Sequence, residues 1–136
     1  VISAPARGTA PLVSESYMAA RMAYEAAGIG PEDVDFVELP DNSSWHYLQY
    51  PETLGFWGPG ETERMLENGD TGPGGKLPIN TSGGNLAECY THGMELINEA
   101  ARQVRGDSTC QVPDCEISLV IAGPAVPLVS DLILHR

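Results

Sequence analysis

The stretch LPINTSGGNLAECYTHGMELINEAARQVRG, residues 77–106, most constrains what this chain can fold into. Its pattern predicts a short strand over 77–80, a turn at 81–84 and one long helix that continues to about Arg105. Gly106 would end that helix. The residues expected on its apolar, core-facing stripe are Leu86, Tyr90, Ile97, Ala101 and Val104. Because glycines at a strand-to-helix turn let backbone N–H groups converge, this turn is typical of an anion or oxyanion site.

The rest of the chain alternates between helix and strand patterns. The other expected elements are the tail of a strand at 1–4, helices or helical turns at 14–27, 45–54 and 61–69, and strands at 34–39, 116–123 and 129–135. Met18 and Met22 recur at helical spacing in the first helix, which Ser14 would cap. We therefore expect an α/β fold in one domain over 1–136, with a mixed sheet covered by helices and closed by an antiparallel strand pair.

Charge and cysteine usage argue against several classes of function. Acidic residues outnumber basic ones by 19 to 7, and the net charge of -12 would repel a nucleic acid. An anionic CoA ester would also find no general attraction, so local groups or a second stretch of polypeptide must hold it. No segment approaches the roughly 20 apolar residues of a membrane helix. Three cysteines without a secretory leader pattern favour a cytoplasmic location. Cys110 and Cys115 form a lone pair, so we expect no metal site.

Three stretches resemble the sterol-carrier-type thiolases. They are AYEAAGIGPEDVDFVEL at 23–39, YPETLGFWGPGE at 50–61 and GGKLPINTSGG at 74–84. The resemblance covers nearly the whole chain and implies the C-terminal half of a thiolase-superfamily protein that acts on acyl-CoA compounds. It also implies an N-terminal thiolase half elsewhere in the polypeptide and a homodimer formed through that half. The sequence begins with Val1 rather than Met, and we interpret this as a sign that the chain is a fragment, a processed chain or a domain of a longer polypeptide.

The chain departs from the thiolase pattern at the catalytic positions. Tyr90 stands where thiolases carry a histidine after the Asn-x-Ser-Gly-Gly turn, and the closing loop IAGPAVP has no acid/base cysteine. Upstream, Pro40-Asp41-Asn42-Ser43 replaces a motif of the type His-Asp-Cys-Phe, of which only the aspartate survives. The nucleophilic cysteine of such thiolases lies in the other half. Ordinary Claisen thiolysis is therefore not expected of this half.

Residues 79–106 are most similar to the thiolase-like aldolases of steroid side-chain degradation. In those enzymes a tyrosine at the position of Tyr90 is implicated in retro-aldol cleavage of a β-hydroxyacyl-CoA. A second tyrosine of theirs falls on Pro40 here. The resemblance implies a separate OB-fold/zinc-ribbon partner protein, and no cofactor beyond the CoA thioester substrate.

Each candidate catalytic residue has a competing structural interpretation. As a base, Tyr90 would need a pKa below the ordinary value of about 10, whereas as a donor to an oxyanion it needs no shift. Alternatively, it packs on the apolar stripe with Leu86 and Ile97. Asp41 is either a base or orienting carboxylate after its strand, or a helix N-cap. His92 is either a group that faces the substrate or a surface histidine, and it could not orient Tyr90 if both were helical.

The turn itself supplies the candidate substrate-binding residues. They are Asn80, Ser82, Gly83 and Gly84, whose N–H groups would face the thioester. His46, Tyr47 and Tyr50 are weaker candidates, and Cys89 is expected to be an inert thiol.

Three functions stay open at this point. The first is an acyl-CoA lyase that performs retro-aldol cleavage on steroid or similar bulky side-chain thioesters. The second is an acyltransferase whose nucleophile lies in the other half. The third is a non-catalytic subunit that binds lipid or scaffolds a partner enzyme, and Pro40 at the second tyrosine position is its best support.

Overall fold

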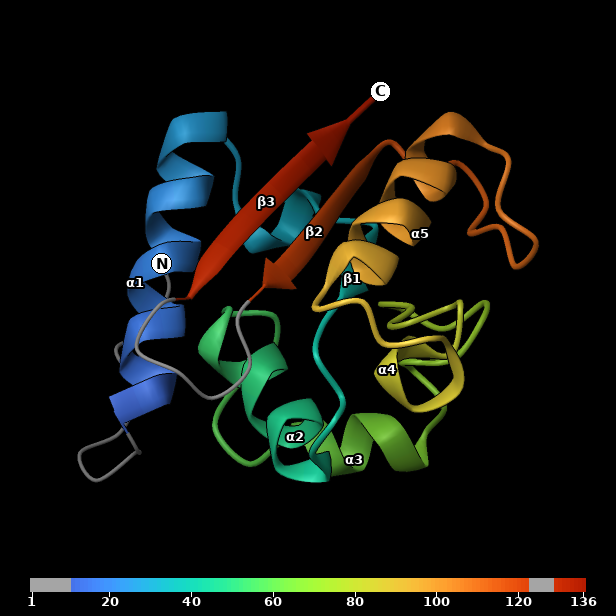
Figure 1. Ribbon diagram of the computed structural model, residues 1–136. Helices are drawn as coiled ribbons and strands as arrows, with labels where there is room; N and C mark the ends of the chain where they lie inside the picture. Colours follow the sequence, from blue (N-terminus) through green and yellow to red (C-terminus); the bar gives the residue numbers. More distant parts are fainter. Residues whose placement is uncertain (1–10, 123–128) are drawn as a thin grey trace.

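The computed structural model describes residues 11–122 and 129–136. The strand tail expected at 1–4 and most of the cysteine-free closing loop lie outside these residues. Within them, a small mixed sheet has helices packed on both faces (Figure 1). No helix in the described ranges is both long enough and apolar enough to cross a membrane.

The sheet contains three strands in the order β1-β2-β3. β1 (Phe36–Glu38) pairs in parallel with β2 (Ile117–Ala122), and β2 pairs antiparallel with β3 (Ser130–His135). This confirms the mixed sheet with a closing antiparallel pair. The strand expected at 77–80 is reduced to a single parallel bridge from Ile79 to Val37, because Asn80 has a φ of +53° and leaves the extended conformation.

Alternation along β1 divides the core into two clusters. Val37 packs on one face with helices α1 (Pro11–Ala27) and α2 (Ser44–Thr53), while Phe36 packs on the other face against α5 (Met94–Arg105). The short elements η1 (Pro31–Asp33) and α3 (Thr62–Glu67) complete the first half of the chain. The strands expected at 34–39, 116–123 and 129–135 are thus confirmed, with slightly narrower bounds.

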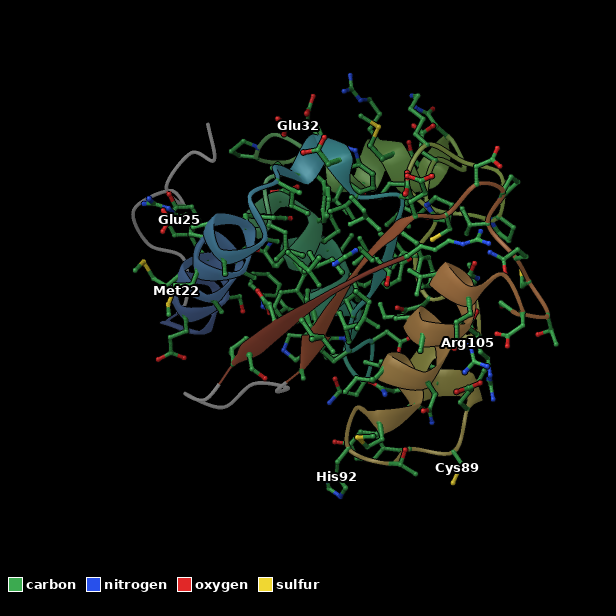
Figure 2. All side chains as sticks on the ribbon, turned by 90° about the horizontal axis from the view of Figure 1, so that it is seen from above. Met22, Glu25, Glu32, Cys89, His92 and Arg105 are labelled. Carbon is green, nitrogen blue, oxygen red and sulfur yellow. The ribbon has the colours of Figure 1, made fainter. Side chains whose placement is uncertain are left out.

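The first helix turns a different face to the core from the one its methionines indicate. It begins at Pro11 rather than at Ser14. Met18 and Met22 are 53% and 67% exposed, and Figure 2 shows Met22 pointing away from the body of the molecule. Ser16, Ala20 and Tyr24 are buried instead. Small residues at two of these three positions let the helix axis approach β3 closely, which is the physical reason for this orientation.

The long helix expected to run to about Arg105 is broken in two. A single turn, α4 (Gly84–Ala87), is followed by a loop over 88–93 and then by α5. His92 and Gly93 both have positive φ, +55° and +93°, and Gly93 is the N-cap of α5. The expected stripe is wrong at its first two positions, since Leu86 is 78% exposed and Tyr90 is 45% exposed, whereas Val104 is buried and Ile97 packs against the same core cluster. The buried face of α5 consists of Glu95, Leu96, Glu99, Ala100, Gln103 and Val104.

Glu95 is the physical cause of this break. Its Oε2 accepts hydrogen bonds from the backbone N–H of Thr91 at 3.0 Å, the Thr91 hydroxyl at 2.7 Å and the N–H of Gly93 at 3.1 Å. The Glu95 carboxylate, in the first turn of α5, thus accepts the backbone N–H groups of Thr91 and Gly93. In a continuous helix these N–H groups would instead donate to carbonyls of the preceding turn. Gly93 supplies the left-handed backbone that the loop then needs.

Gln103 joins α5 to the segment that leads into β2. Its Nε2 donates to Thr81 Oγ1 at 2.8 Å, to Glu99 Oε1 at 3.0 Å and to the carbonyl of Cys110 at 2.8 Å. Its Oε1 accepts the N–H of Val112 at 2.8 Å. Every polar atom of this fully buried amide is therefore in use.

We predict that Gln103→Leu lowers the free energy of unfolding by about 2–4 kcal/mol, because the Cys110 carbonyl and the Val112 N–H lose a buried partner. Denaturant titration of the full-length polypeptide measures this. Arg105→Gln on the exposed side of the same helix is the matched control and should change stability by less than about 0.5 kcal/mol. Equal effects of the two substitutions would contradict the assignment.

Glu95 also predicts an acid-sensitive loop. Burial alone would raise the pKa of Glu95, but hydrogen bonds from the Thr91 side chain and from backbone N–H groups bring it below the ordinary value of 4.5. A carboxyl with a lowered folded pKa stabilises the fold above its unfolded pKa, and that stabilisation is lost as pH falls through the folded value.

We therefore expect the melting temperature of the full-length protein to fall more steeply below pH ~4.5 than that of Glu95→Gln. At neutral pH the variant should be the less stable of the two. Thermal unfolding between pH 3 and pH 7 checks both statements, with the exposed Glu67→Gln as control. Parallel curves for wild type and Glu95→Gln would show that Glu95 does not hold the loop.

Candidate functional site

The predicted site residues lie at the carboxyl end of the parallel strands β1 and β2. Asp41 follows β1, and the turn over 80–84 follows the bridge between Ile79 and β1. Gly93, three residues after Tyr90, lies beside Ala122 at the end of β2. A Cβ atom placed on Gly93 would be 4.0 Å from the Ala122 Cβ. This end of a parallel strand pair is where α/β proteins commonly place ligand-binding groups.

Asn80 fixes the chain that leads to Asp41. Its Nδ2 donates to the carbonyl of Leu39 at 2.9 Å, and its Oδ1 accepts the N–H of Leu39 at 2.8 Å. Its own backbone N–H donates to the carbonyl of Val37 at 3.0 Å. Because all of these atoms are committed within the fold, Asn80 supports the site from below rather than offering a free donor.

Two backbone N–H groups at this turn have partners within the fold. The N–H of Gly83 donates to the carbonyl of Asn80 at 2.9 Å, and the N–H of Asn85 donates to Asp41 Oδ1 at 2.7 Å. The anion that the start of α4 binds is thus the Asp41 side chain. Asp41 is not the N-cap of the helix that follows it: its carboxylate accepts the N–H of the second residue of α4, a helix whose own N-cap is Gly83. The helix that follows Asp41, α2, has Ser43 at its own N-cap position.

Gly84 is required by this arrangement. It has a φ of +62°, and a Cβ there would lie 2.6 Å from Asn80 Nδ2 and even closer to the Asp41 carboxylate. Ser82 has a buried hydroxyl for which the described residues offer no hydrogen-bond partner. Among the side chains of the four turn residues, the Ser82 hydroxyl is the buried polar group without a hydrogen-bond partner in the described residues.

Asn85 connects Asp41 to the loop that carries Tyr90. Its side-chain amide donates a hydrogen bond to Glu95 Oε1, while its backbone N–H is held by Asp41. Glu95 in turn holds Thr91 and Gly93 through its other oxygen. We call Asp41, Asn85 and Glu95 the Asn85 bridge. The sequence interpretation missed two of its members, Asn85 and Glu95, although an acidic residue two positions after a glycine, in the first turn of a helix, is a usable signal for Glu95.

Tyr90 and His92 lie together on the loop held by the Asn85 bridge. Their ring centroids are 4.9 Å apart, with the planes tilted by 45°. The argument that His92 could not orient Tyr90 applied only if both residues were helical, and neither is, because both lie in the loop. The packing alternative for Tyr90 is wrong for the same reason. Figure 2 shows His92 and Cys89 projecting outward from this end of the molecule.

An apolar groove of about 310 Å³ adjoins Asp41. The residues that line it are Asp41, Ser44, Tyr47, Leu48, Leu66 and Leu86. Burial raises the pKa of the Tyr47 phenol, which therefore stays neutral. His46 and Tyr50 do not line this groove. Both residues belong to α2, their side chains are buried, and their ring centroids are 5.4 Å apart.

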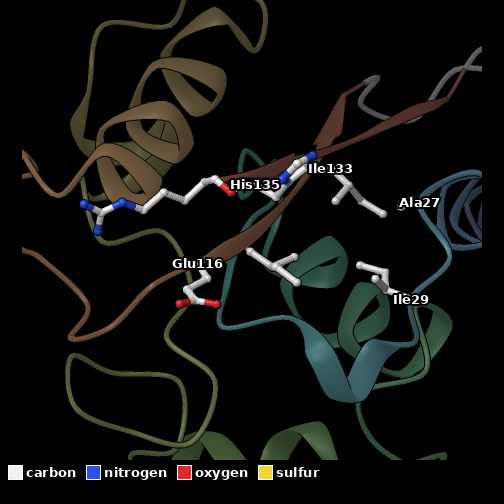
Figure 3. Close-up of a pocket in the computed structure, with 7 residues that line it drawn as sticks. Ala27, Ile29, Glu116, Ile133 and His135 are labelled. Carbon is white, nitrogen blue, oxygen red and sulfur yellow. Dashed lines mark hydrogen bonds between the residues drawn. The ribbon is translucent and has the colours of Figure 1, made fainter.

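A second concavity, of about 280 Å³, lies at the opposite end of the sheet (Figure 3). It is lined by Ala27, Ile29, Glu116, Ile117, Ile133, His135 and Arg136. Ile117 begins β2 and pairs with His135 at the end of β3, so this concavity faces away from the predicted site. Among the described residues, no group of three His, Cys, Asp or Glu side chains is arranged to hold a metal ion, and Cys89, Cys110 and Cys115 are free thiols.

Comparison with known proteins places the chain in a family. A family model described as thiolase C-terminal domain-like matches residues 6–130. The 17-hydroxy-3-oxo-4-pregnene-20-carboxyl-CoA lyase of Mycobacterium tuberculosis is 42% identical over 120 residues, which cover 88% of this chain and 31% of that protein. The steroid side-chain-cleaving aldolase of Thermomonospora curvata is 40% identical over 122 residues, which cover 90% of this chain and 31% of that protein.

A solved structure, described as the Ltp2-ChsH2(DUF35) aldolase, matches with a TM-score of 0.85 and 39% identity. The match covers 89% of this chain and 31% of the chain in the solved structure. This chain therefore spans less than a third of the length of the relatives it matches. The sheet, the order of its elements and the sequence match over residues 6–130 agree: the chain belongs to the thiolase C-terminal domain-like family.

Proposed function

We propose that this chain is the C-terminal domain of a thiolase-like aldolase that cleaves a carbon–carbon bond in a β-hydroxyacyl-CoA. The observation that carries the proposal is the position of Tyr90. It lies beside His92 at 4.9 Å, on a loop that the Asn85 bridge ties to Asp41 at the carboxyl end of β1. The relatives named as a CoA lyase and as a side-chain-cleaving aldolase support the same reaction class.

Retro-aldol cleavage makes two demands on a site. A base removes the proton of the β-hydroxyl while the bond between the α and β carbons breaks, and the β carbon becomes a carbonyl. The electron pair of that bond passes to the thioester enolate, which then takes up a proton at the α carbon to give a shortened acyl-CoA. The site must therefore accept one proton, return one proton and stabilise an oxyanion.

Residues of the turn over 80–84 and of the loop over 88–93 are the candidates for these roles. In the proposal, the Tyr90 hydroxyl transfers the proton or donates to the oxyanion. The imidazole of His92, whose ring centroid lies 4.9 Å from that of the phenol, is the adjacent general acid/base. The Ser82 hydroxyl, which has no partner among the described residues, is a further donor for the thioester. The Asp41 carboxylate is occupied by Asn85 and acts by holding the loop.

The substrate and the assembly are further parts of the proposal. The names of the relatives point to steroid side-chain thioesters, and the apolar groove beside Asp41 suits a bulky hydrocarbon group. The solved relative is described with two components, Ltp2 and ChsH2(DUF35). We infer that this protein also works with an OB-fold/zinc-ribbon partner in the cytoplasm, as a homodimer. An N-terminal thiolase half would complete the site, with no cofactor beyond the CoA thioester.

We predict that Tyr90→Phe lowers kcat/KM for β-hydroxyacyl-CoA cleavage by about 10²–10⁴-fold, the range for loss of a proton-transfer group. Because the Tyr90 ring is half exposed, the variant should keep its melting temperature. The experiment gives the full-length protein, with its partner polypeptide, a β-hydroxyacyl-CoA in one reaction and a β-ketoacyl-CoA plus free CoA in another. Mass spectrometry reads the products.

Cys89→Ser is the matched control, since Cys89 is the exposed neighbour of Tyr90. It should leave cleavage unchanged. Shortened acyl-CoA from the β-ketoacyl-CoA alone would identify an acyltransferase and refute the aldolase proposal. Turnover of neither substrate would favour a lipid-binding or scaffolding subunit.

A further inference from the structure

Glu38 is a buried carboxyl group that the reaction proposed above does not use. It occupies the last position of β1, is 0% exposed and shares the α5-facing side of the strand with Phe36. Within residues 11–122 and 129–136, neither of its carboxyl oxygens has a hydrogen-bond partner. Its neighbour across the sheet is Val120. A charged carboxylate would be strongly disfavoured in these surroundings.

The titratable groups that face Glu38 are all acidic. Within the described residues they are the carboxyl groups of Glu99 and Glu95 from α5, Glu88 from the loop after α4 and Asp41 from the loop after β1, together with the Tyr47 phenol from α2. β2 presents only neutral side chains to this strand, Ser118 and Val120. The nearby cation, Arg102, is half exposed and reaches Glu99 at 3.9 Å on the outer side of α5. Among the residues that the structure describes, no positive charge therefore compensates Glu38.

Two of these acidic groups form the Asn85 bridge. Asp41 accepts the N–H of Asn85 at 2.7 Å, and Glu95 accepts the Asn85 side-chain amide together with Thr91 and Gly93. Hydrogen bonds to ionised carboxylates are stronger than those to neutral groups. A negative charge on Glu38 would repel both carboxylates, because Glu38 interacts electrostatically with Asp41 and with Glu95. This repulsion would loosen the loop that the two carboxylates hold.

We propose that Glu38 is a positioning residue that must stay uncharged for Asp41 and Glu95 to hold the Tyr90 loop through Asn85, so that its ionisation releases the loop. Burial first, and then the four acidic neighbours, raise the pKa of Glu38 to about 9. It is therefore protonated at neutral pH. A group with a raised folded pKa stabilises the fold fully below its unfolded pKa and loses that contribution as pH rises through the folded value.

The first test measures the loop without any reaction. Amide hydrogen exchange over residues 88–93 of the full-length protein, corrected for the intrinsic effect of pH, is followed from pH 7 to pH 10. We expect protection to fall by about tenfold or more with a midpoint near pH 9. Glu38→Gln, which is neutral at every pH, should abolish this pH dependence. Glu67→Gln, an exposed change on α3, should leave it as in wild type.

The second test uses activity and rests on the proposed function. Cleavage by wild type should decline above pH ~9 together with loop protection, while Glu38→Gln should keep its rate into that range. Flat protection in wild type over pH 7–10 would overturn the proposal, even if Glu38→Gln does not fold. The same pH dependence in wild type and Glu38→Gln would also overturn it. If the loop responds but no aldol cleavage occurs, Glu38 keeps its role and the proposed function fails.

Discussion

The arrangement of the candidate site depends on one asparagine that joins two carboxylates. Asn85 donates its backbone N–H to Asp41 and its side-chain amide to Glu95. The two acceptors come from different parts of the chain, one after β1 and one in the first turn of α5. Without this link, the loop that carries Tyr90 would be tied only to its own helix. With it, the loop is fixed to the carboxyl end of the sheet.

Burial of acidic groups is a second theme of this domain. Glu95 and Glu99 are buried and fully used, since Glu99 accepts hydrogen bonds from Thr81, Gln103 and Ser108. Glu38 is equally buried but has no such donors among the described residues. The acidic residues behind the net charge of -12 are therefore not all on the solvated surface. Some of them are buried, and their hydrogen bonds hold the segments around the site.

The sequence predicted where helices and strands lie along the chain better than it predicted which side of each helix packs against the core. Strong local signals, such as the alternation around Phe36 and the glycine after Arg105, located β1 and the end of α5 correctly. The helix over 84–105 failed, because its pattern is compatible with continuous helix and nothing local shows that Glu95 will capture Thr91 and Gly93. The outward orientation of Met18 was missed for a similar reason, since spacing alone does not say which side of a helix meets the sheet.

By itself, the sequence determined the class of fold and the family, and it led to the prediction that Tyr90 takes the place of the thiolase histidine. These follow from patterns along the chain, which local backbone preferences and motif order encode directly. Only the tertiary structure decided that Asp41 accepts the N–H of Asn85 at the start of α4, that Tyr90 and His92 are neighbours, and that the buried carboxyl oxygens of Glu38 have no hydrogen-bond partner among the described residues. Such relations join residues up to 44 positions apart, and they form only when packing of the sheet and helices brings the segments together.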